Sequence, residues 1–304
     1  MQPPTNQAIS PAVCTAVVVT FEPDAALLNN LRSLCSQVGQ IIVVDNGSAG
    51  TSLEIVEQVG HLAGVHLVRN EENLGIAAAL NVGIHHALDA GCQWVATFDQ
   101  DSAVTACYFE DLLRAYAICP EPEKVGMIVP GQWVPHGEPD GGAQNVARRD
   151  FTFVKGASNS GCLIRADIFS RIGFYDEPLF IDYVDTDFCL RLRKRGFRIL
   201  CAPQVVLRHE LGDKQVRRFL GLSISFRIHS AWRYYYNIRN RTVLHLRYLA
   251  SFPAWVLWDW SRMLLELCRI AILEHQRGHK LACAFQGLWD GLRGRLGRHP
   301  DFPK

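Results

Sequence analysis

Apolar, β-branched runs alternate with helix-type segments along the first hundred residues. Four such runs predict strands, at residues 13–20, 41–44, 65–69 and 94–99. Apolar residues at helical spacing predict helices at 25–38 and 76–90, and the turn 45–48 opens another helical stretch. Strands and helices that alternate at this pitch form right-handed βαβ crossovers. The pattern therefore predicts an α/β fold, with a mostly parallel, doubly wound sheet and helices on both faces.

Polar residues stand at the ends of the predicted strands. They are Thr20, Asp45, Asn70 and the pair Asp99 and Asp101. The carboxyl ends of parallel strands meet at one edge of a sheet, where open α/β folds bind ligands, so a nucleotide would fit among them. Alternate strand residues share a face, so both carboxylates of the pair can bind one divalent cation, or one can bind the metal and the other a sugar hydroxyl. A solvated acidic turn is the competing interpretation.

A second acidic cluster lies at the start of a later predicted helix. It contains Asp182, Asp185 and Asp187, and Arg191 follows one turn later. Carboxylates at a helix start also cap the helix or balance its dipole, so a purely structural role stays open. Between the two clusters, the prolines and glycines of 125–155 indicate loops and a candidate active-site flap.

The region after residue 213 has a different character. The stretch 233–241 is aromatic and cationic, and 254–274 predicts a helix with one narrow polar stripe. The stripe consists of Asp259, Arg262, Glu266 and Arg269. The rest of this helix is apolar, so it is either buried against the domain or lies in a membrane interface.

Charge divides the chain into two unlike parts. Residues 1–190 carry 9 Lys and Arg against 23 Asp and Glu, a net of −14, and residues 191–304 carry 22 against 7, a net of +15. An acidic part suits a site that holds cations, and a basic part suits anionic lipid, phosphate or nucleic acid. Single-stranded nucleic acid is an alternative partner for 233–241. The acidic part disfavours it, so no nucleic-acid partner is expected.

Other features narrow the compartment and the class. Ten cysteines are scattered singly without a Cys-x-x-Cys pair, which indicates free thiols in a reducing cytosol. The N-terminus lacks the pattern of a signal peptide, and no uncharged apolar stretch of about 18 residues predicts a transmembrane helix. The chain has neither a Gly-x-Gly-x-x-Gly fingerprint nor a Gly-Lys-Ser/Thr loop, which disfavours a dinucleotide oxidoreductase or an NTPase. We expect a tail at 1–12, an α/β catalytic domain at 13–212 and a helical, basic extension at 213–304.

Taken together, these motifs resemble the inverting family 2 glycosyltransferases of GT-A fold, over roughly residues 13–212. The matching pieces are Val-Val-Thr-Phe at 18–21, Val-Asp-Asn-Gly-Ser at 44–48, Asn73 and Gly75 with Asn81 and Gly83, Asp-Gln-Asp at 99–101, Ser160-Gly161, the acidic run with its arginine at 184–191, and His209. The stretches 98–102 and 180–185 look most like the rhamnosyltransferase branch. The chain departs from many relatives at Glu22, where they have Asn, and at Val184, where they have an acidic residue before the aspartate.

The resemblance implies a role for each matched residue. It implies that Thr20, Phe21, Asp45, Asn73, Gly75 and Asp99 bind the donor nucleotide, and that Asp101 and His209 bind Mg²⁺ or Mn²⁺. Asp185 would be the general base. Ser160, Gly161, Asp182, Asp187 and Arg191 would lie around the sugar or the acceptor.

The implied reaction is transfer of L-rhamnose from dTDP-L-rhamnose to a glycan or glycolipid acceptor, in cell-surface polysaccharide or rhamnolipid biosynthesis. Two alternatives stay open: another donor such as UDP-galactofuranose or a further hexose, and a non-enzymatic scaffold that binds nucleotide or membrane. A lipid-linked acceptor fits the membrane interpretation of the C-terminal helices. The expected location is therefore cytoplasmic, peripheral at the inner face of the cytoplasmic membrane.

Overall fold

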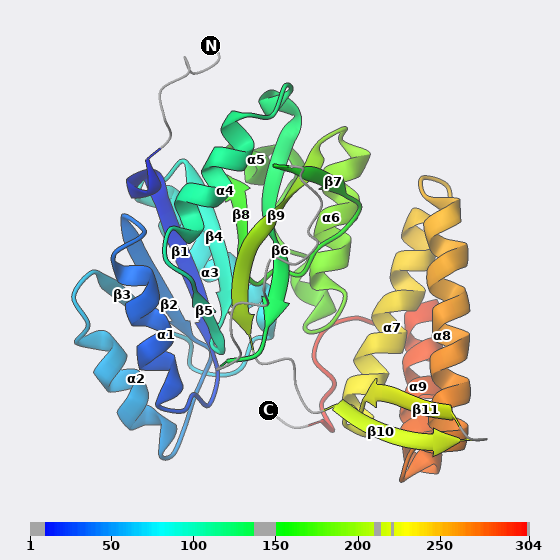
Figure 1. Cartoon of the computed structure of the whole chain (residues 1–304). Helices are drawn as coiled ribbons and strands as arrows, with labels where there is room; N and C mark the ends of the chain where they lie inside the picture. Colours follow the sequence, from blue (N-terminus) through cyan, green and yellow to red (C-terminus); the bar gives the residue numbers. More distant parts are fainter. Residues whose placement is uncertain (1–9, 137–149, 210–213, 220–221, 303–304) are drawn as a thin grey trace.

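The computed structural model describes residues 10–136, 150–209, 214–219 and 222–302 (Figure 1). Three expectations fall partly or wholly outside these residues. They are most of the N-terminal tail, the central part of the expected flap, and the expected boundary between 212 and 213.

Within the described residues, nine strands form one sheet in the order β3-β2-β1-β4-β8-β6-β9-β5, and β7 pairs with β9. The strands are β1 Cys14–Thr20, β2 Gln40–Asp45, β3 Val65–Arg69, β4 Trp94–Asp99, β5 Ser102–Val104, β6 Val125–Val134, β7 Thr152–Val154, β8 Cys162–Arg165 and β9 Arg198–His209. The first four are parallel, as the strand and helix alternation predicts. β8 enters antiparallel between β4 and β6, so the second half of the sheet is mixed.

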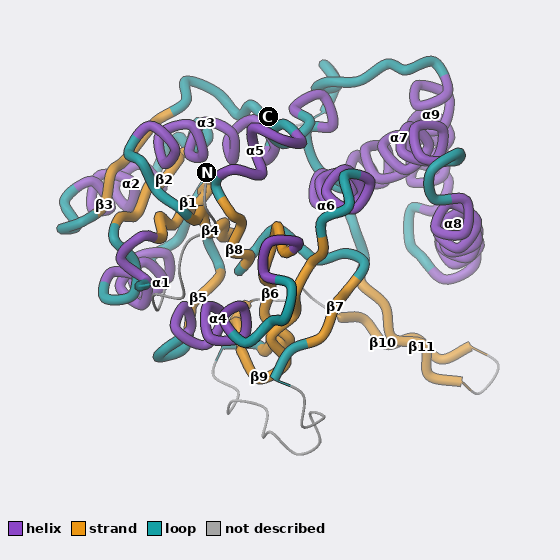
Figure 2. The backbone as a smooth tube through the Cα atoms, turned by 90° about the horizontal axis from the view of Figure 1, so that it is seen from above, coloured by secondary structure: helices purple, strands orange, loops and turns teal. Residues whose placement is uncertain are grey.

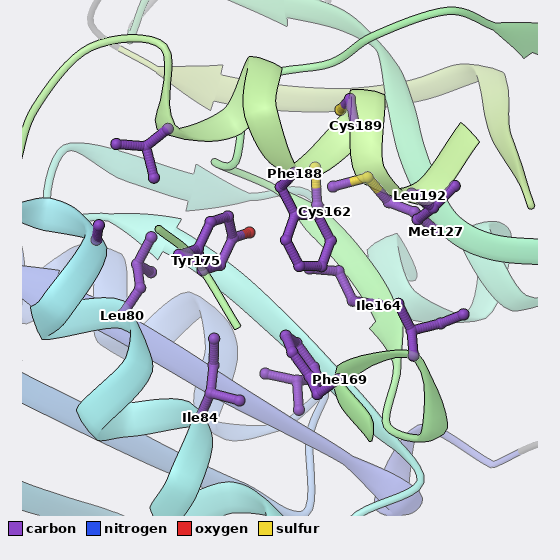
Figure 3. Close-up of a cluster of buried hydrophobic side chains, with 14 of the residues drawn as sticks. Leu80, Ile84, Met127, Cys162, Ile164, Phe169, Tyr175, Phe188, Cys189 and Leu192 are labelled. Atoms are coloured by element: carbon purple, nitrogen blue, oxygen red, sulfur yellow. The ribbon is translucent and has the colours of Figure 1, made fainter. Parts of the chain in front are cut away.

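Helices cover both faces of the sheet, as predicted. One face carries α1 Ala26–Cys35, α2 Ser52–Gly60 and α4 Tyr108–Ala117, and the other carries α3 Ile76–Asp89, α5 Asp167–Ile172 and α6 Val184–Lys194. Figure 2 shows α3, α5 and α6 on one side of the strands and α1 and α4 on the other. Each side has its own apolar core. In Figure 3, Phe188 of α6 lies beside Tyr175, whose ring stacks on it at 4.6 Å between centroids.

The small residues of α3 serve close packing against the sheet. A Cβ atom at Gly83 would lie only 2.3 Å from Cγ1 of Val17, so β1 and α3 approach as closely as glycine allows. Ala77 and Ala79 are also fully buried in this core.

The C-terminal helices, α7 Ala231–Tyr248, α8 Pro253–Leu273 and α9 Arg277–Leu292, stand beside the sheet together with the hairpin of β10 Lys214–Phe219 and β11 Leu222–Arg227 (Figure 1). Leu244 and Tyr248 of α7 join the core beneath α3 and α6. Among the described helices, none is long and apolar enough to cross a bilayer.

Helix α8 covers the predicted segment, but polar residues lie on its inward side beside apolar ones, and large apolar residues also cover its outward side. Asp259 of the predicted polar stripe is buried, with Glu266 and Arg269 partly buried beside it. Arg262 departs from the stripe because it is exposed, with its guanidinium 4.9 Å from the ring centre of Trp258. Large apolar residues of α8 face outward: Leu257, Trp258, Trp260, Leu264, Leu265 and Ile272.

Candidate active site

The strand register brings the predicted nucleotide residues to one edge of the sheet. Thr20 pairs with Asp45, and Val19 pairs with Asp99, so the ends of β1, β2 and β4 are level. The side chain of Gln100 ties this edge together, since its Oε1 accepts hydrogen bonds from Thr20 Oγ1 at 2.7 Å and from the Phe21 backbone N–H at 2.8 Å. Gln100 was not among the predicted site residues, although it lies between two that were.

Asp45 is fully buried at the end of β2, and only one of its oxygens accepts hydrogen bonds from described residues. Oδ1 accepts hydrogen bonds from the hydroxyl and the backbone N–H of Ser48, at 2.5 Å and 3.3 Å. Oδ2 is buried and makes no hydrogen bond to any described residue, with Arg69 Nε 3.6 Å away. A buried carboxylate oxygen without a donor is costly, so this edge favours a ligand that brings an N–H group.

Asp99, Asp101 and His209 form a cluster suited to a metal ion. Each offers one ligand atom, and these atoms lie within 4.8 Å of one another. His209 Nδ1 is 3.1 Å from Asp101 Oδ1, within ion-pair distance, but that buried oxygen receives no well-aligned hydrogen bond from the described residues. Burial, followed by the negative charge of Asp101, raises the pKa of Asp99 to about 6. Two crowded carboxylates and an imidazole fit a divalent cation such as Mg²⁺ or Mn²⁺, because a cation relieves their repulsion and binds the spare oxygen.

Two serines hold this cluster in place. The Ser160 hydroxyl is buried, accepts the Asp99 backbone N–H at 3.1 Å and lies 2.7 Å from the Ser102 hydroxyl. Ser102 Oγ in turn lies 2.9 Å from His209 Nδ1. The neighbouring Gly161 donates its N–H to Thr97 O at 2.8 Å, and the Tyr108 hydroxyl leaves no room for a Cβ atom there. Ser160 and Gly161 thus support the cluster from below, and Ser102 is a residue that the sequence reasoning missed.

Asp185 lies in the first turn of α6, after the N-cap residue Tyr183, so it is not the helix cap. Burial raises the pKa of Asp185 to about 6, and the charge of Asp182 adds to this, while hydrogen bonds from Thr186 act against it. The Asp185 charge also contributes to raising the pKa of Asp99. The two predicted acidic clusters therefore lie within electrostatic reach of each other, although 80 residues separate them in the sequence, and the crevice expected at the carboxyl ends of the strands would lie between them.

The loop before Asp185 has an unusual backbone. Phe180, Asp182 and Tyr183 have φ angles of 65°, 62° and 63°, in the left-handed region that non-glycine residues seldom adopt. The Asp182 carboxylate pairs with Arg233 of α7, with Nη2 3.0 Å from Oδ1. This arginine also contributes to lowering the pKa of Asp99, so α7 adds positive charge at the crevice.

Asn73 and Gly75 shape the rim of the crevice. Asn73 Oδ1 accepts hydrogen bonds from Asn46 Nδ2 at 2.9 Å and from the Gly75 N–H at 3.0 Å. Gly75 has φ 86°, and a Cβ atom there would lie 2.5 Å from the ring of Phe180. The rim loop is thereby docked on the loop before Asp185, and direct contact of these two residues with a nucleotide stays a prediction.

Asp187 and Arg191 connect α6 to α7. The fully buried carboxylate of Asp187 accepts hydrogen bonds from Arg191 Nε, Arg247 Nη1 and the Tyr248 hydroxyl, at 2.7 Å, 2.7 Å and 2.8 Å. With these partners the carboxylate is well satisfied. Their expected place around the sugar or the acceptor is untested and stays a prediction.

The comparisons with known proteins agree with this arrangement. A family model described as Glycosyl transferase family 2 matches residues 15–172. The dTDP-rhamnosyl transferase RfbF of Shigella flexneri is 30% identical over 299 residues, which cover 93% of this chain and 96% of that protein. The low-salt glycan biosynthesis hexosyltransferase Agl10 of Haloferax volcanii is 24% identical over 242 residues, covering 74% of this chain and 73% of that protein.

Among solved structures, GalNAc-T7 with UDP, GalNAc and Mn²⁺ is similar with a TM-score of 0.53 and 16% sequence identity. The match covers 68% of this chain and 44% of that one. It shows that the sheet and its helices have the GT-A fold, as the sequence resemblance implied.

Proposed function

The chain belongs to glycosyl transferase family 2 and is a glycosyltransferase, and we propose that its donor is dTDP-L-rhamnose. In this proposal it transfers L-rhamnose to a glycan or glycolipid acceptor during the biosynthesis of a cell-surface polysaccharide or a rhamnolipid. The observation that carries the choice of donor is the 30% identity to a dTDP-rhamnosyl transferase, which runs through the α/β part and the C-terminal helices alike. The proposed reaction is a metal-assisted single displacement.

In this proposal the thymine base lies at the ends of β1 and β2. The spare Oδ2 of Asp45 accepts the imide N–H of the base, which gives that buried oxygen its missing donor. Thr20 and Phe21 line the base from β1, Asp99 contacts the ribose, and Asn73 with Gly75 closes the rim.

Asp101 and His209 would hold Mg²⁺ or Mn²⁺, with Asp99 beside them. When bound there, such a cation would supply positive charge that stabilises the departing diphosphate. The protein's own part here is to fix these side chains, through Ser102 and Ser160, before the donor arrives.

Asp185 is the proposed general base. As the acceptor oxygen forms its bond to the anomeric carbon, the bond to the diphosphate breaks and the diphosphate leaves with the electron pair. The proton of the acceptor hydroxyl ends on the Asp185 carboxylate, and the β-linked donor sugar becomes α-linked. A pKa of about 6 suits this task, because the group is ionised at neutral pH yet is basic enough to take a proton. Asp182 lies on the acceptor side, whereas the contacts of Ser160, Gly161, Asp187 and Arg191 favour support of the site.

We also propose a peripheral contact with the inner face of the cytoplasmic membrane, through the outer face of α8. Leu257, Trp258, Trp260 and Leu265 are each at least half exposed there. Tryptophans beside an arginine, in a region with net charge +15, match an anionic lipid surface. Such a contact would bring the crevice to a lipid-linked acceptor.

The donor can be tested without knowing the acceptor. The full chain is incubated with Mn²⁺ or Mg²⁺ and with dTDP-L-rhamnose, UDP-galactofuranose, UDP-glucose or GDP-mannose, and slow donor hydrolysis and thermal stabilisation are measured. We expect a selective response to dTDP-L-rhamnose that Asp101→Asn abolishes. Asp111→Asn, at a partly exposed aspartate of α4 that pairs with Arg114, is the matched control and should respond as the unchanged chain does. A selective response to another donor would overturn the rhamnose assignment, and no response to any donor would count against donor binding in this crevice.

A further inference from the structure

The aromatic, cationic stretch 233–241, for which nucleic acid was an alternative partner, packs instead against the loop before Asp185. Residues 233, 236 and 240 share one face of α7, since they lie three and four positions apart. Arg233 pairs with the Asp182 carboxylate, and the Tyr236 ring stacks on Phe180 with 5.1 Å between centroids. Side chains on this face of α7 therefore contact individual side chains of the loop.

Asn240 makes the closest connection, to the loop backbone. It is fully buried, and its Nδ2 donates to the carbonyls of Leu179, Ile181 and Asp182 at 2.8 Å, 2.7 Å and 2.9 Å. Arg239 Nε donates to Asn240 Oδ1 at 3.0 Å, which fixes the orientation of the amide because only its oxygen can accept. The two N–H bonds of this one amide are thus shared among three carbonyls within four residues of the loop.

The loop requires such support because its conformation is costly by itself. Three of its non-glycine residues, Phe180, Asp182 and Tyr183, are in the left-handed region. From the opposite side, the Phe180 carbonyl accepts the Ile76 N–H at 2.9 Å. The carbonyls of 179, 181 and 182 point to α7 and that of 180 points to α3, so the loop is clamped between the two helices.

We propose that Asn240 is a positioning residue for the transfer, which holds loop 179–183 in the backbone conformation that aims Asp182 and Asp185 into the crevice. This inference rests on the proposed function, in which Asp185 is the general base. Asn240 itself touches loop carbonyls and no reacting atom. Its loss should therefore impair the chemical step while leaving the nucleotide end of the crevice intact.

The test compares Asn240→Ala with Leu244→Ala in the full chain. Leu244 is buried on the same helix, in the core beneath α3 and α6, and its apolar side chain makes no hydrogen bond, so its truncation weakens α7 without removing a hydrogen bond to the loop. For hydrolysis of dTDP-L-rhamnose with Mn²⁺, we expect Asn240→Ala to lower kcat at least tenfold with KM within about threefold. Leu244→Ala should lower Tm yet keep kcat within about threefold. Unchanged kcat in Asn240→Ala, or an equal loss in both variants, would overturn the proposal.

Amide hydrogen exchange of residues 181–185 tests the same idea without any turnover. We expect exchange to rise at least tenfold in Asn240→Ala and to stay near the original rate in Leu244→Ala. Equal exchange in the two variants would contradict a positioning role. The variant Asp185→Asn distinguishes failure of the proposed function from failure of this inference. If Asp185→Asn keeps full hydrolysis, the general-base assignment fails. The amide exchange of the loop still decides whether Asn240 holds the loop.

Discussion

The crevice and the C-terminal helices both bury carboxylates, but they treat them in opposite ways. In the crevice, Asp45 and Asp101 each keep a buried oxygen that no described residue hydrogen-bonds, and the pKa values of Asp99 and Asp185 are raised to about 6. Asp259 of α8 instead receives hydrogen bonds from Arg241, His245 and Tyr183. Burial acts to raise the pKa of Asp259, but His245 and Arg241 outweigh it and hold that pKa below its usual range.

This difference in how buried carboxylates are partnered distinguishes a ligand-binding site from a structural support. A buried carboxylate oxygen that receives no hydrogen bond destabilises the fold even beside a charged partner, so its presence is best explained where a cation, a nucleotide or a proton completes it. A buried carboxylate whose oxygens are all hydrogen-bonded or ion-paired fixes the local geometry and has no oxygen left to bind a ligand. Glu274 follows the second pattern, because it pairs with Arg269 and Lys280 and accepts the Tyr234 hydroxyl. In the proposed mechanism the crevice is the reactive part, and the Arg233–Asp182 pair and Asn240 connect the C-terminal helices to the loop beside it.

The largest expected effect is that of Asp185→Asn on turnover. Removing the general base should slow transfer and hydrolysis about 10³-fold, with metal-dependent stabilisation by dTDP unchanged. Because the pKa of Asp185 is raised, its ionised form destabilises the fold above pH 6, so the neutral amide should keep or raise Tm at pH 7.5. Hydrolysis kinetics measure the expected loss of turnover, and thermal unfolding measures the expected Tm. Full turnover in this variant would remove Asp185 from the mechanism, and a large fall in Tm would place it with the compensated carboxylates.

Asp259→Asn is the matched change in the other region and should act on stability. It leaves Arg241 and His245 without their shared carboxylate, and breaking a buried pair in this way costs about 3 kcal/mol. The free energy of unfolding from urea titration at pH 7.5 measures it. Because the pKa of Asp259 is lowered, its stabilisation is present above the unfolded pKa and is lost as the pH falls, so the two proteins should converge in stability in acid. An equally stable variant would contradict the division between site and support.

The pH dependence of turnover gives a smaller effect. With saturating Mn²⁺ and donor, kcat for hydrolysis should fall about tenfold per pH unit below pH 6, because protonated Asp185 cannot accept a proton. The residual rate of Asp185→Asn should lack this acid limb. A limb that persists in the variant would assign it to another group in the crevice.

The sequence predicted well which strand ends come together, because strand periodicity and parallel pairing are local rules. Strand periodicity and parallel pairing suffice to bring Thr20, Asp45 and Asp99 to one edge, and the structure has them there. The antiparallel pairing of β8 with β4 was not predicted, because an apolar run in the sequence does not indicate whether the strand runs parallel or antiparallel to its neighbours. Arg233 and Asn240 were missed as parts of the crevice wall because their contacts depend on how α7 packs, about 50 to 60 residues after the loop they hold. The same packing decides which side of α8 faces inward, and a helical wheel alone leaves that open.

The apolar outer face of helix α8 leads to the smallest expected effect on catalysis. Trp258 and Leu265 are 54% and 69% exposed, so changing both to Ser removes apolar surface without opening the core. Hydrolysis of free donor should stay within about twofold, whereas binding to vesicles that contain anionic lipid should weaken about tenfold or more, because apolar burial in the interface is lost. Co-sedimentation with such vesicles measures this, and Leu74→Ser, which alters an exposed leucine of the rim loop, is the control that should bind as before. If the double variant still binds vesicles fully, the outer face of α8 is not the membrane contact. If the double variant also loses donor hydrolysis, the outer face of α8 contributes to catalysis itself and not only to membrane binding.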